Sequence, residues 1–204
     1  MAKKKVAKKK TKVASRTPAR RPAARKTARK TKKAPAMDHD AMMAKWQKAM
    51  TPADGHARLE PMVGIWHATT TFTMTPGAPP QVTEGRSEHR WALGGRFLEQ
   101  RYKGISMGMP FEGVGYTGYD NVQRRYVGTW MDTFGTGFMS SVGVGRPTDE
   151  KMEFEAEAFE PSGKRIRFWT ELRVKDRNRH SFAMWTKAPN GRRYRTMLVE
   201  YTRA

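Results

Sequence analysis

The chain of 204 residues contains no cysteine and no long apolar run. The absence of cysteine excludes disulfides, a thiol nucleophile and thiolate metal ligation. No apolar run approaches the ~18 residues that a membrane-spanning helix requires, so we expect no membrane span. The basic N-terminus is not followed by the apolar segment of a secretory signal, which predicts a cytoplasmic protein.

Acidic residues are also absent from the first 36 positions, which hold 16 Lys and Arg. The remaining 168 residues hold 24 basic and 19 acidic side chains, so the first segment carries +16 of the net charge of +21. Beyond Met1, Val6 and Val13 are its only larger aliphatic side chains. Low hydrophobicity with high net charge predicts a disordered tail over residues 1–36.

This tail, AKKKVAKKKTKVA followed by TPARRPAARKTARKTKKAP, resembles the Lys/Ala/Pro-rich tails of histone H1 and of bacterial H1-like proteins. A flexible polycation releases counterions when it lies along phosphates, whatever the base sequence. We therefore expect non-specific nucleic-acid binding, to DNA more than RNA, and association with the nucleoid. A solvating tail and an anionic membrane surface are the alternatives. The expected nucleic-acid-binding residues are Lys3, Lys4, Lys5, Lys8, Lys9, Lys10, Lys12, Arg16, Arg20, Arg21, Arg25, Lys26, Arg29, Lys30, Lys32 and Lys33.

Residues 37–63 read as a helical lead-in. Asp38 or Asp40 can cap a first helix, and Pro52 can open the next helical turn. A stripe of Met and Trp side chains around Trp46 recurs at helical spacing. We expect this stripe to pack as a lid over the end of the following domain, with a partner-binding helix as the alternative.

Residues 64–204 alternate apolar and polar side chains in short runs, with turn signals every 8–12 residues. This rhythm predicts strands and no helical crossovers, and therefore an all-β, antiparallel up-and-down barrel of 8–10 strands. The expected strands lie at about 66–74, 82–93, 96–106, 111–119, 124–131, 138–144, 152–159, 165–174, 180–187 and 192–203.

Two further resemblances sharpen this expectation. Gly64-Ile65-Trp66 resembles the entry to lipocalin-like (calycin) barrels, which implies that Trp66 closes the barrel under an Arg of the last strand, Arg203 or secondarily Arg195. LGGRFLEQRYKG, mGmPFEGvGytGYDN, YVGTWMDTFGTG and the closing EYTR resemble the bacterial family known as domain of unknown function 1579 over roughly residues 40–203. The resemblance implies a lipocalin-like barrel and no established activity.

Chemistry is harder to place. The five histidines show no metal-ligand spacing, and no serine lies in a Gly-x-Ser-x-Gly context, so we assign no metal, cofactor or catalytic residue. His67 and His89 lie on neighbouring predicted strands. With Glu84 and Glu88 nearby, they could form an acid/base or metal pair, although an exposed polar face explains them equally well.

The interior of the predicted barrel is the best candidate site, because a closed sheet of this size is filled by side chains or holds one small ligand. Polar and aromatic residues of the central stretch are expected near its mouth: Arg96, Tyr102, Phe111, Tyr119, Trp130 and Asp132. The expectation is a non-enzymatic barrel that binds a small apolar ligand and is tethered to nucleic acid. Two alternatives remain: an enzyme that uses Arg96, Asp132 and His67 or His89 on a small apolar or carboxylate-bearing substrate, and a structural nucleoid protein.

Overall fold

The computed structural model describes residues 38–145, 148 and 150–204. The predicted basic tail and its sixteen cations lie outside the described residues. The elements in chain order are α1 (His39–Met50), α2 (Asp54–Ala57), the 3-10 helix η1 (Glu60–Met62), β1 (Gly64–Phe72), β2 (Gln81–Ala92), β3 (Phe97–Ser106), β4 (Met109–Asp120), β5 (Arg125–Asp132), β6 (Met139–Val144), β7 (Lys151–Phe159), β8 (Arg165–Asp176), β9 (Arg179–Lys187) and β10 (Arg193–Arg203).

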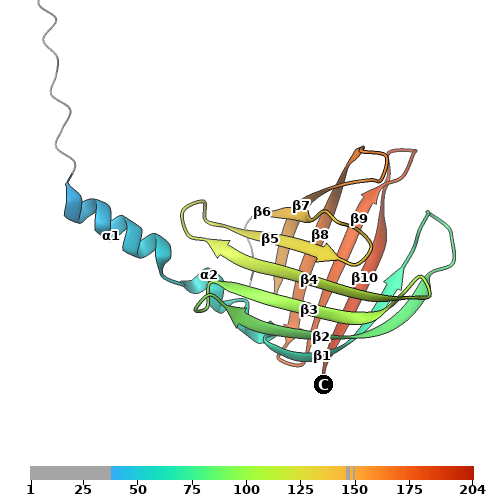
Figure 1. Ribbon diagram of the computed structural model, residues 1–204, viewed down its shortest axis with the longest axis horizontal. Helices are drawn as coiled ribbons and strands as arrows, with labels where there is room; N and C mark the ends of the chain where they lie inside the picture. Colours follow the sequence, from blue (N-terminus) through green and yellow to red (C-terminus); the bar gives the residue numbers. More distant parts are fainter. Residues whose placement is uncertain (1–37, 146–147, 149) are drawn as a thin grey trace, which may run out of the picture. The chain divides into compact units, whose positions relative to one another are not determined.

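The ten strands form one closed antiparallel barrel in which each strand pairs with its neighbours in sequence and β10 pairs with β1 (Figure 1). The predicted fold class is therefore confirmed, and each predicted strand lies within about two residues of an observed one. The hairpins 73–80, 107–108, 133–138, 160–164 and 188–192 fall at one end, which we call the open end. The helical segments and the hairpin loops 93–96, 121–124 and 177–178 lie at the closed end.

Alternation along the strands directs apolar side chains inward. In β7, Met152, Phe154 and Ala156 are buried, and the glutamates between them face outward. β1 buries Trp66 and Ala68 completely. Because successive side chains of a strand point to opposite faces, this pattern alone fixes which face is inside.

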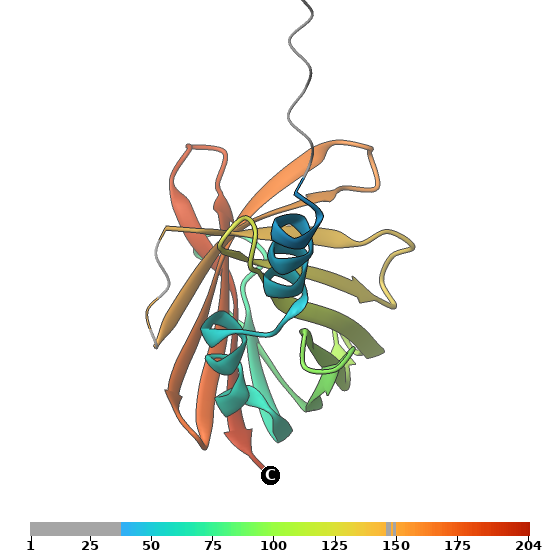
Figure 2. The same ribbon diagram turned by 90° about the vertical axis from the view of Figure 1, so that its left-hand side faces the viewer.

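The closed end is covered by α2 and η1, which Figure 2 shows lying across the strand ends. Leu59 and Met62 from this segment are fully buried and pack with Leu98, Tyr126 and Phe154 from the barrel. Burial of a Leu or Met side chain contributes about 1.5–3 kcal/mol, so this short segment is a substantial part of the core.

Helix α1 does not have the expected role. Asp38 caps it by accepting a hydrogen bond from the Ala41 amide at 3.2 Å, but the helix buries none of its residues. Trp46 is 58% exposed. Asn121 Nδ2 donates to backbone carbonyls at the end of this helix, at 2.7 Å to that of Thr51. The prediction that this stripe forms a lid is therefore wrong, because helical periodicity identifies an apolar face but not what packs against it. α2 and η1 cover the barrel instead.

Strand glycines let aromatic rings lie directly on the backbone. A Cβ atom added to Gly113 would come within 2.1 Å of the Trp130 ring, and one added to Gly115 within 2.8 Å. Tyr102 lies in the same way over Gly85, with its hydroxyl 2.3 Å from the added Cβ position. Glycine within a strand indicates such a close approach. These residues therefore set the positions of Trp130 and Tyr102.

We predict that Gly113→Ala lowers the free energy of unfolding by about 1–3 kcal/mol, because the indole of Trp130 must move to admit the methyl group. Urea titration followed by circular dichroism measures the change. Gly137→Ala is the matched control, since no atom lies within 4 Å of its added Cβ. Equal stability of the two variants would contradict the assigned contact.

Candidate functional site

The closed end of the interior is organised around Trp66. Its Nε1 donates to the Met62 carbonyl at 2.9 Å, and the guanidinium of Arg203 lies 4.2 Å from the ring centroid. Arg203 also donates to the carbonyls of Val63 at 3.0 Å, Pro61 at 3.2 Å and Arg177 at 2.7 Å. Arg203, and not Arg195, therefore joins the last strand to the first strand and the helical cover.

A chain of polar side chains lies above this plug. Gln100 Nε2 donates to the Tyr201 hydroxyl at 2.9 Å and to Ser87 Oγ at 3.2 Å. Ser87 Oγ lies 2.9 Å from His89 Nε2. Ser87, His89 and Tyr201 are all buried, and burial raises the pKa of Tyr201 above its ordinary value. The barrel interior is therefore polar on one side.

His180 completes this cluster from β9. Its ring stacks on Tyr201 with centroids 4.3 Å apart, meets Trp66 edge-on at 4.3 Å and lies 5.2 Å from the His89 ring. Neither ring nitrogen of His180, nor Nδ1 of His89, has a hydrogen-bond partner among the residues described. Buried polar atoms without partners are rare in folded proteins. Three such nitrogens in one interior make this cluster the most unusual polar feature of the barrel.

Both imidazoles are held neutral. Burial lowers the pKa of His89 to about 3. The nearby Met62 carbonyl opposes this shift in part, although it does not form a hydrogen bond with Nδ1. Burial first, and then repulsion from His89 once it is protonated at low pH and from Arg203, lower the pKa of His180 to about 2. Neutral imidazole can donate one hydrogen bond and accept another, so the pair can orient a polar group but cannot supply a charge at pH 7.

Four of the predicted pocket residues gather at the open end. Tyr102 and Phe111 lie 5.8 Å apart, and Phe111 meets Phe134 at 5.0 Å. Trp130 Nε1 donates to Asp132 Oδ2 at 2.9 Å. Tyr102 and Asp132 also border an open groove of about 540 Å³ beside β3, β4 and β5.

The other two predicted pocket residues lie at the closed end. Arg96 is in the exposed β2–β3 turn, where Nη1 donates to the Leu93 carbonyl at 3.0 Å. Tyr119 packs against Tyr126 at 5.1 Å and His56 at 6.1 Å. Proximity in sequence suggested one group of six, but the strands between these residues carry them to opposite ends.

The possible pair of His67 and His89 is not brought together, because the two side chains lie on opposite faces of the sheet. His67 is exposed on the outside of β1, whereas His89 is buried inside β2. Glu84 lies on the outer face and accepts a hydrogen bond from Thr69. Inside the barrel, His89 lies within hydrogen-bonding distance of Ser87 and its ring is next to that of His180. His180 opens a strand just after a turn, where a polar residue usually faces solvent, so sequence patterns gave no sign of its burial.

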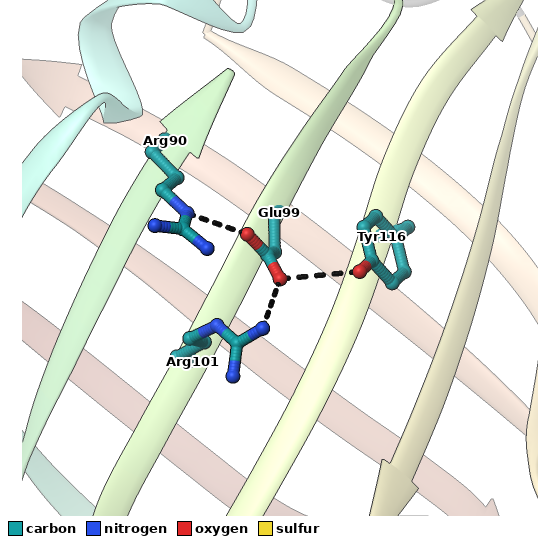
Figure 3. Close-up of polar contacts among 4 residues, drawn as sticks. All are labelled: Arg90, Glu99, Arg101 and Tyr116. Atoms are coloured by element: carbon teal, nitrogen blue, oxygen red, sulfur yellow. Dashed lines mark hydrogen bonds and ion pairs between the residues drawn. The ribbon is translucent and has the colours of Figure 1, made fainter. Parts of the chain in front are cut away.

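A buried charged group lies on the outer wall. Glu99 of β3 is 4% exposed and accepts hydrogen bonds from Arg90 at 2.6 Å, Arg101 at 2.7 Å and Tyr116 at 3.1 Å (Figure 3). The bond from Arg90 holds the pKa of Glu99 below its ordinary value, against the opposing effect of burial. Both acceptor oxygens are used, so this carboxylate is a structural element of the wall.

Within the described residues, no group of three or more His, Asp or Glu side chains is arranged to hold a metal ion. No helix in the same part of the chain is both long and apolar enough to cross a membrane.

We predict that acid destabilises this protein through its buried histidines. Their folded pKa values lie below the ordinary 6.5, so only the unfolded chain takes up protons as pH falls below about 6.5. Each histidine then removes about 1.4 kcal/mol of stability per pH unit between roughly pH 6 and 4. His180→Phe should reduce this slope by one histidine's share, as measured by urea unfolding at four pH values. Exposed His67→Asn is the control, and parallel pH profiles for His180→Phe and the parent would refute the assignment.

Comparison with known proteins identifies the family of this barrel. No curated protein sequence matches the chain significantly. The crystal structure of Rv2717c from M. tuberculosis superposes with a TM-score of 0.54 at 17% identity, covering 76% of this chain and 99% of that one. A redesigned β-barrel matches with a TM-score of 0.41 at 15% identity, covering 75% and 99%. The first likeness supports the barrel fold alone. A family model described as "Protein of unknown function (DUF1579)" matches residues 51–203, and the chain therefore belongs to this family.

Proposed function

We propose that the barrel binds one small, largely apolar ligand through its open end. The observation that carries this proposal is a difference in packing between the two halves of the interior. At the closed end, inward-facing side chains such as Trp66, Met62 and Met152 are at most 2% exposed. Towards the open end, Phe111, Trp130, Phe182 and Met197 border the core but are only partly buried.

Partly accessible aromatic surface inside a barrel suits a flat apolar molecule. Phe111 and Trp130 are partly buried and present ring surface, and the buried ring of Tyr102 contacts Phe111. Aromatic pairs gain about 0.5–1.5 kcal/mol beyond the area they bury. Asp132 is occupied by the Trp130 indole and by the Phe134 amide at 2.9 Å. The walls therefore offer mainly apolar contact, and the polar histidine cluster lies deeper.

Anilinonaphthalene sulfonate, an anionic dye with an apolar aromatic body, is a suitable first probe of this site. We predict that Trp130→Leu weakens dye binding about tenfold, since a large stacking surface is lost. Fluorescence titration of the full chain measures the change. Trp46→Leu, on the exposed face of α1, is the control and should bind like the parent. Equal binding by the Trp130 variant would place the dye elsewhere and remove support for this pocket.

Native mass spectrometry of protein purified from its host complements the dye. A co-purified small molecule that is lost from the Trp130→Leu variant would support the pocket and reveal its ligand. A mass matching the bare chain, together with no dye binding, would favour a filled barrel with a scaffolding role.

We further propose that residues 1–36 attach the barrel to nucleic acid, with DNA in the nucleoid as the main target. The support is the sequence itself: sixteen cations, no acidic residue and an H1-like composition. Counterion release makes such binding strong at low salt and indifferent to base sequence.

We predict that the full chain binds duplex DNA much more tightly than a chain beginning at Met37. If ~10 cations engage phosphates, log K should fall with log salt at a slope of about −9. Fluorescence anisotropy over a salt series gives both quantities, and matching far-ultraviolet spectra would show that the shorter chain is folded. Equal affinities of the two chains would end the nucleic-acid proposal.

The enzyme alternative has less support. Of its proposed residues, Arg96 lies in an exposed turn at the closed end, and His67 faces outward from the barrel. Asp132 lies at the open end and accepts a hydrogen bond from the Trp130 indole. Catalysis requires groups within hydrogen-bond reach of one reacting atom. Their separation therefore favours ligand binding over this reaction site.

A further inference from the structure

Exposed apolar side chains gather at the open end. Four of its hairpins carry Met or Phe side chains that are between 42% and 71% exposed. We call them the apolar rim: Met74, Met107, Met109, Phe134, Phe138 and Phe159. Figure 1 shows the five hairpins of the open end at the right and upper right of the barrel. Single exposed apolar residues are normal, but a set that shares one end of a fold marks an interaction surface.

The charges of the open end are arranged in two sectors. The loops 73–80, 107–108 and 133–138 contain no charged residue at all. The loops 160–164 and 188–192 contain Lys164 and Arg192 with one acidic residue, Glu160. Arg193 continues the basic side, with its guanidinium 3.7 Å from the centre of the Trp169 ring. The rim thus joins an uncharged apolar sector to a basic sector.

The closed-end hairpins differ. Leu93 and Val122 are 73% and 75% exposed, but each is a single apolar residue on its loop. Acidic side chains are built into two of these turns, where Asp120 and Asp176 accept backbone hydrogen bonds. The loops 73–80, 107–108 and 133–138 therefore combine exposed apolar side chains with an absence of charge, whereas the closed-end loops 93–96 and 121–124 each contain an arginine.

We propose that the apolar rim docks on the surface of a bilayer containing anionic lipid. The uncharged loops insert their Met and Phe side chains among the acyl chains, and the basic sector contacts the headgroups. Amphipathic surfaces bind membranes by this pairing of buried apolar area with cationic attraction. Unbranched Met side chains adapt to an irregular partner. The inference goes beyond an interior ligand and does not depend on one.

Charge argues for this occupant over two others. Nucleic acid can meet the basic sector but offers phosphates, not hydrocarbon, to Phe138 and Met107. A second copy would bring its own basic sector against the first in a symmetric pairing of rims, which like charges oppose. An anionic bilayer satisfies both sectors together.

The test compares two double variants of the full chain. Met107→Asn with Phe138→Ser removes apolar surface from the rim. Leu93→Asn with Val122→Ser makes equivalent changes at the closed end. The pairs are matched, since Leu93 and Met107 have φ values of 49° and 50°, a conformation that Asn tolerates. The basic tail is present in every protein, so its attraction to anionic lipid is common to all.

Sedimentation with phosphatidylcholine vesicles, with and without phosphatidylglycerol, measures binding at low and high salt. We expect the rim variant to bind phosphatidylglycerol vesicles at least about tenfold more weakly than the parent. The closed-end variant should match the parent. High salt should weaken all three proteins but preserve the difference, because apolar insertion is not screened.

Two results would overturn the proposal. The first is equal vesicle binding by the rim variant and the parent. The second is a dimer of the parent in analytical ultracentrifugation that the rim variant does not form, together with unchanged vesicle binding by that variant. The rim would then be an interface between two copies of the chain. The dye titration on the same variants shows whether the interior pocket survives independently.

Discussion

The contact of Arg203 with Trp66 is the constraint on which the barrel depends. A meander of ten strands closes only if the last strand meets the first, and Arg203 and Trp66 occupy paired positions in that last seam. The same guanidinium donates to the carbonyls of Pro61 and Val63 in the helical cover and to that of Arg177 in the β8–β9 turn. One side chain therefore joins the seam, the plug and the cover, and it does so beside fully buried aromatic surface.

The interior divides because of this plug. Below, large apolar side chains fill the space around Trp66 and the helical cover. Further along, glycines on β4 remove Cβ atoms from the wall, so Trp130 lies flat against the strand and leaves the centre less crowded. Side chains that are at most 2% exposed at one end and partly buried aromatic side chains at the other are the difference on which the ligand proposal rests. The histidine pair lies at the closed end, where both rings contact Trp66.

Local patterns predicted much of this fold, and long-range contacts account for what they missed. Alternation along β7 and β8 gave both the strands and their inner faces, because a strand's period of two is a local property. The Gly-x-Trp entry pointed to Trp66 because its position before the first strand is also local. His180 and Tyr201 stack across β9 and β10, and Arg96 and Tyr119 lie at the closed end, away from the other predicted pocket residues. These placements depend on strand register and barrel tilt, which are set only when all ten strands pair. The apolar face of α1 was predicted from its periodicity, but its exposure in the folded chain could not be predicted from a local pattern.

The Glu99 carboxylate on the outer wall has a consequence for how the strands align. Its three donors come from β2, β3 and β4, so it ties together strands that backbone pairing alone would allow to slide. A slip of one residue turns every side chain to the other face. It would carry this carboxylate, with Arg101 of the same strand, into the interior, away from Arg90 and Tyr116 and next to apolar side chains. Misaligned forms of this sheet therefore bury charged groups that have lost two of their hydrogen bonds, which favours the native alignment over its nearest competitor.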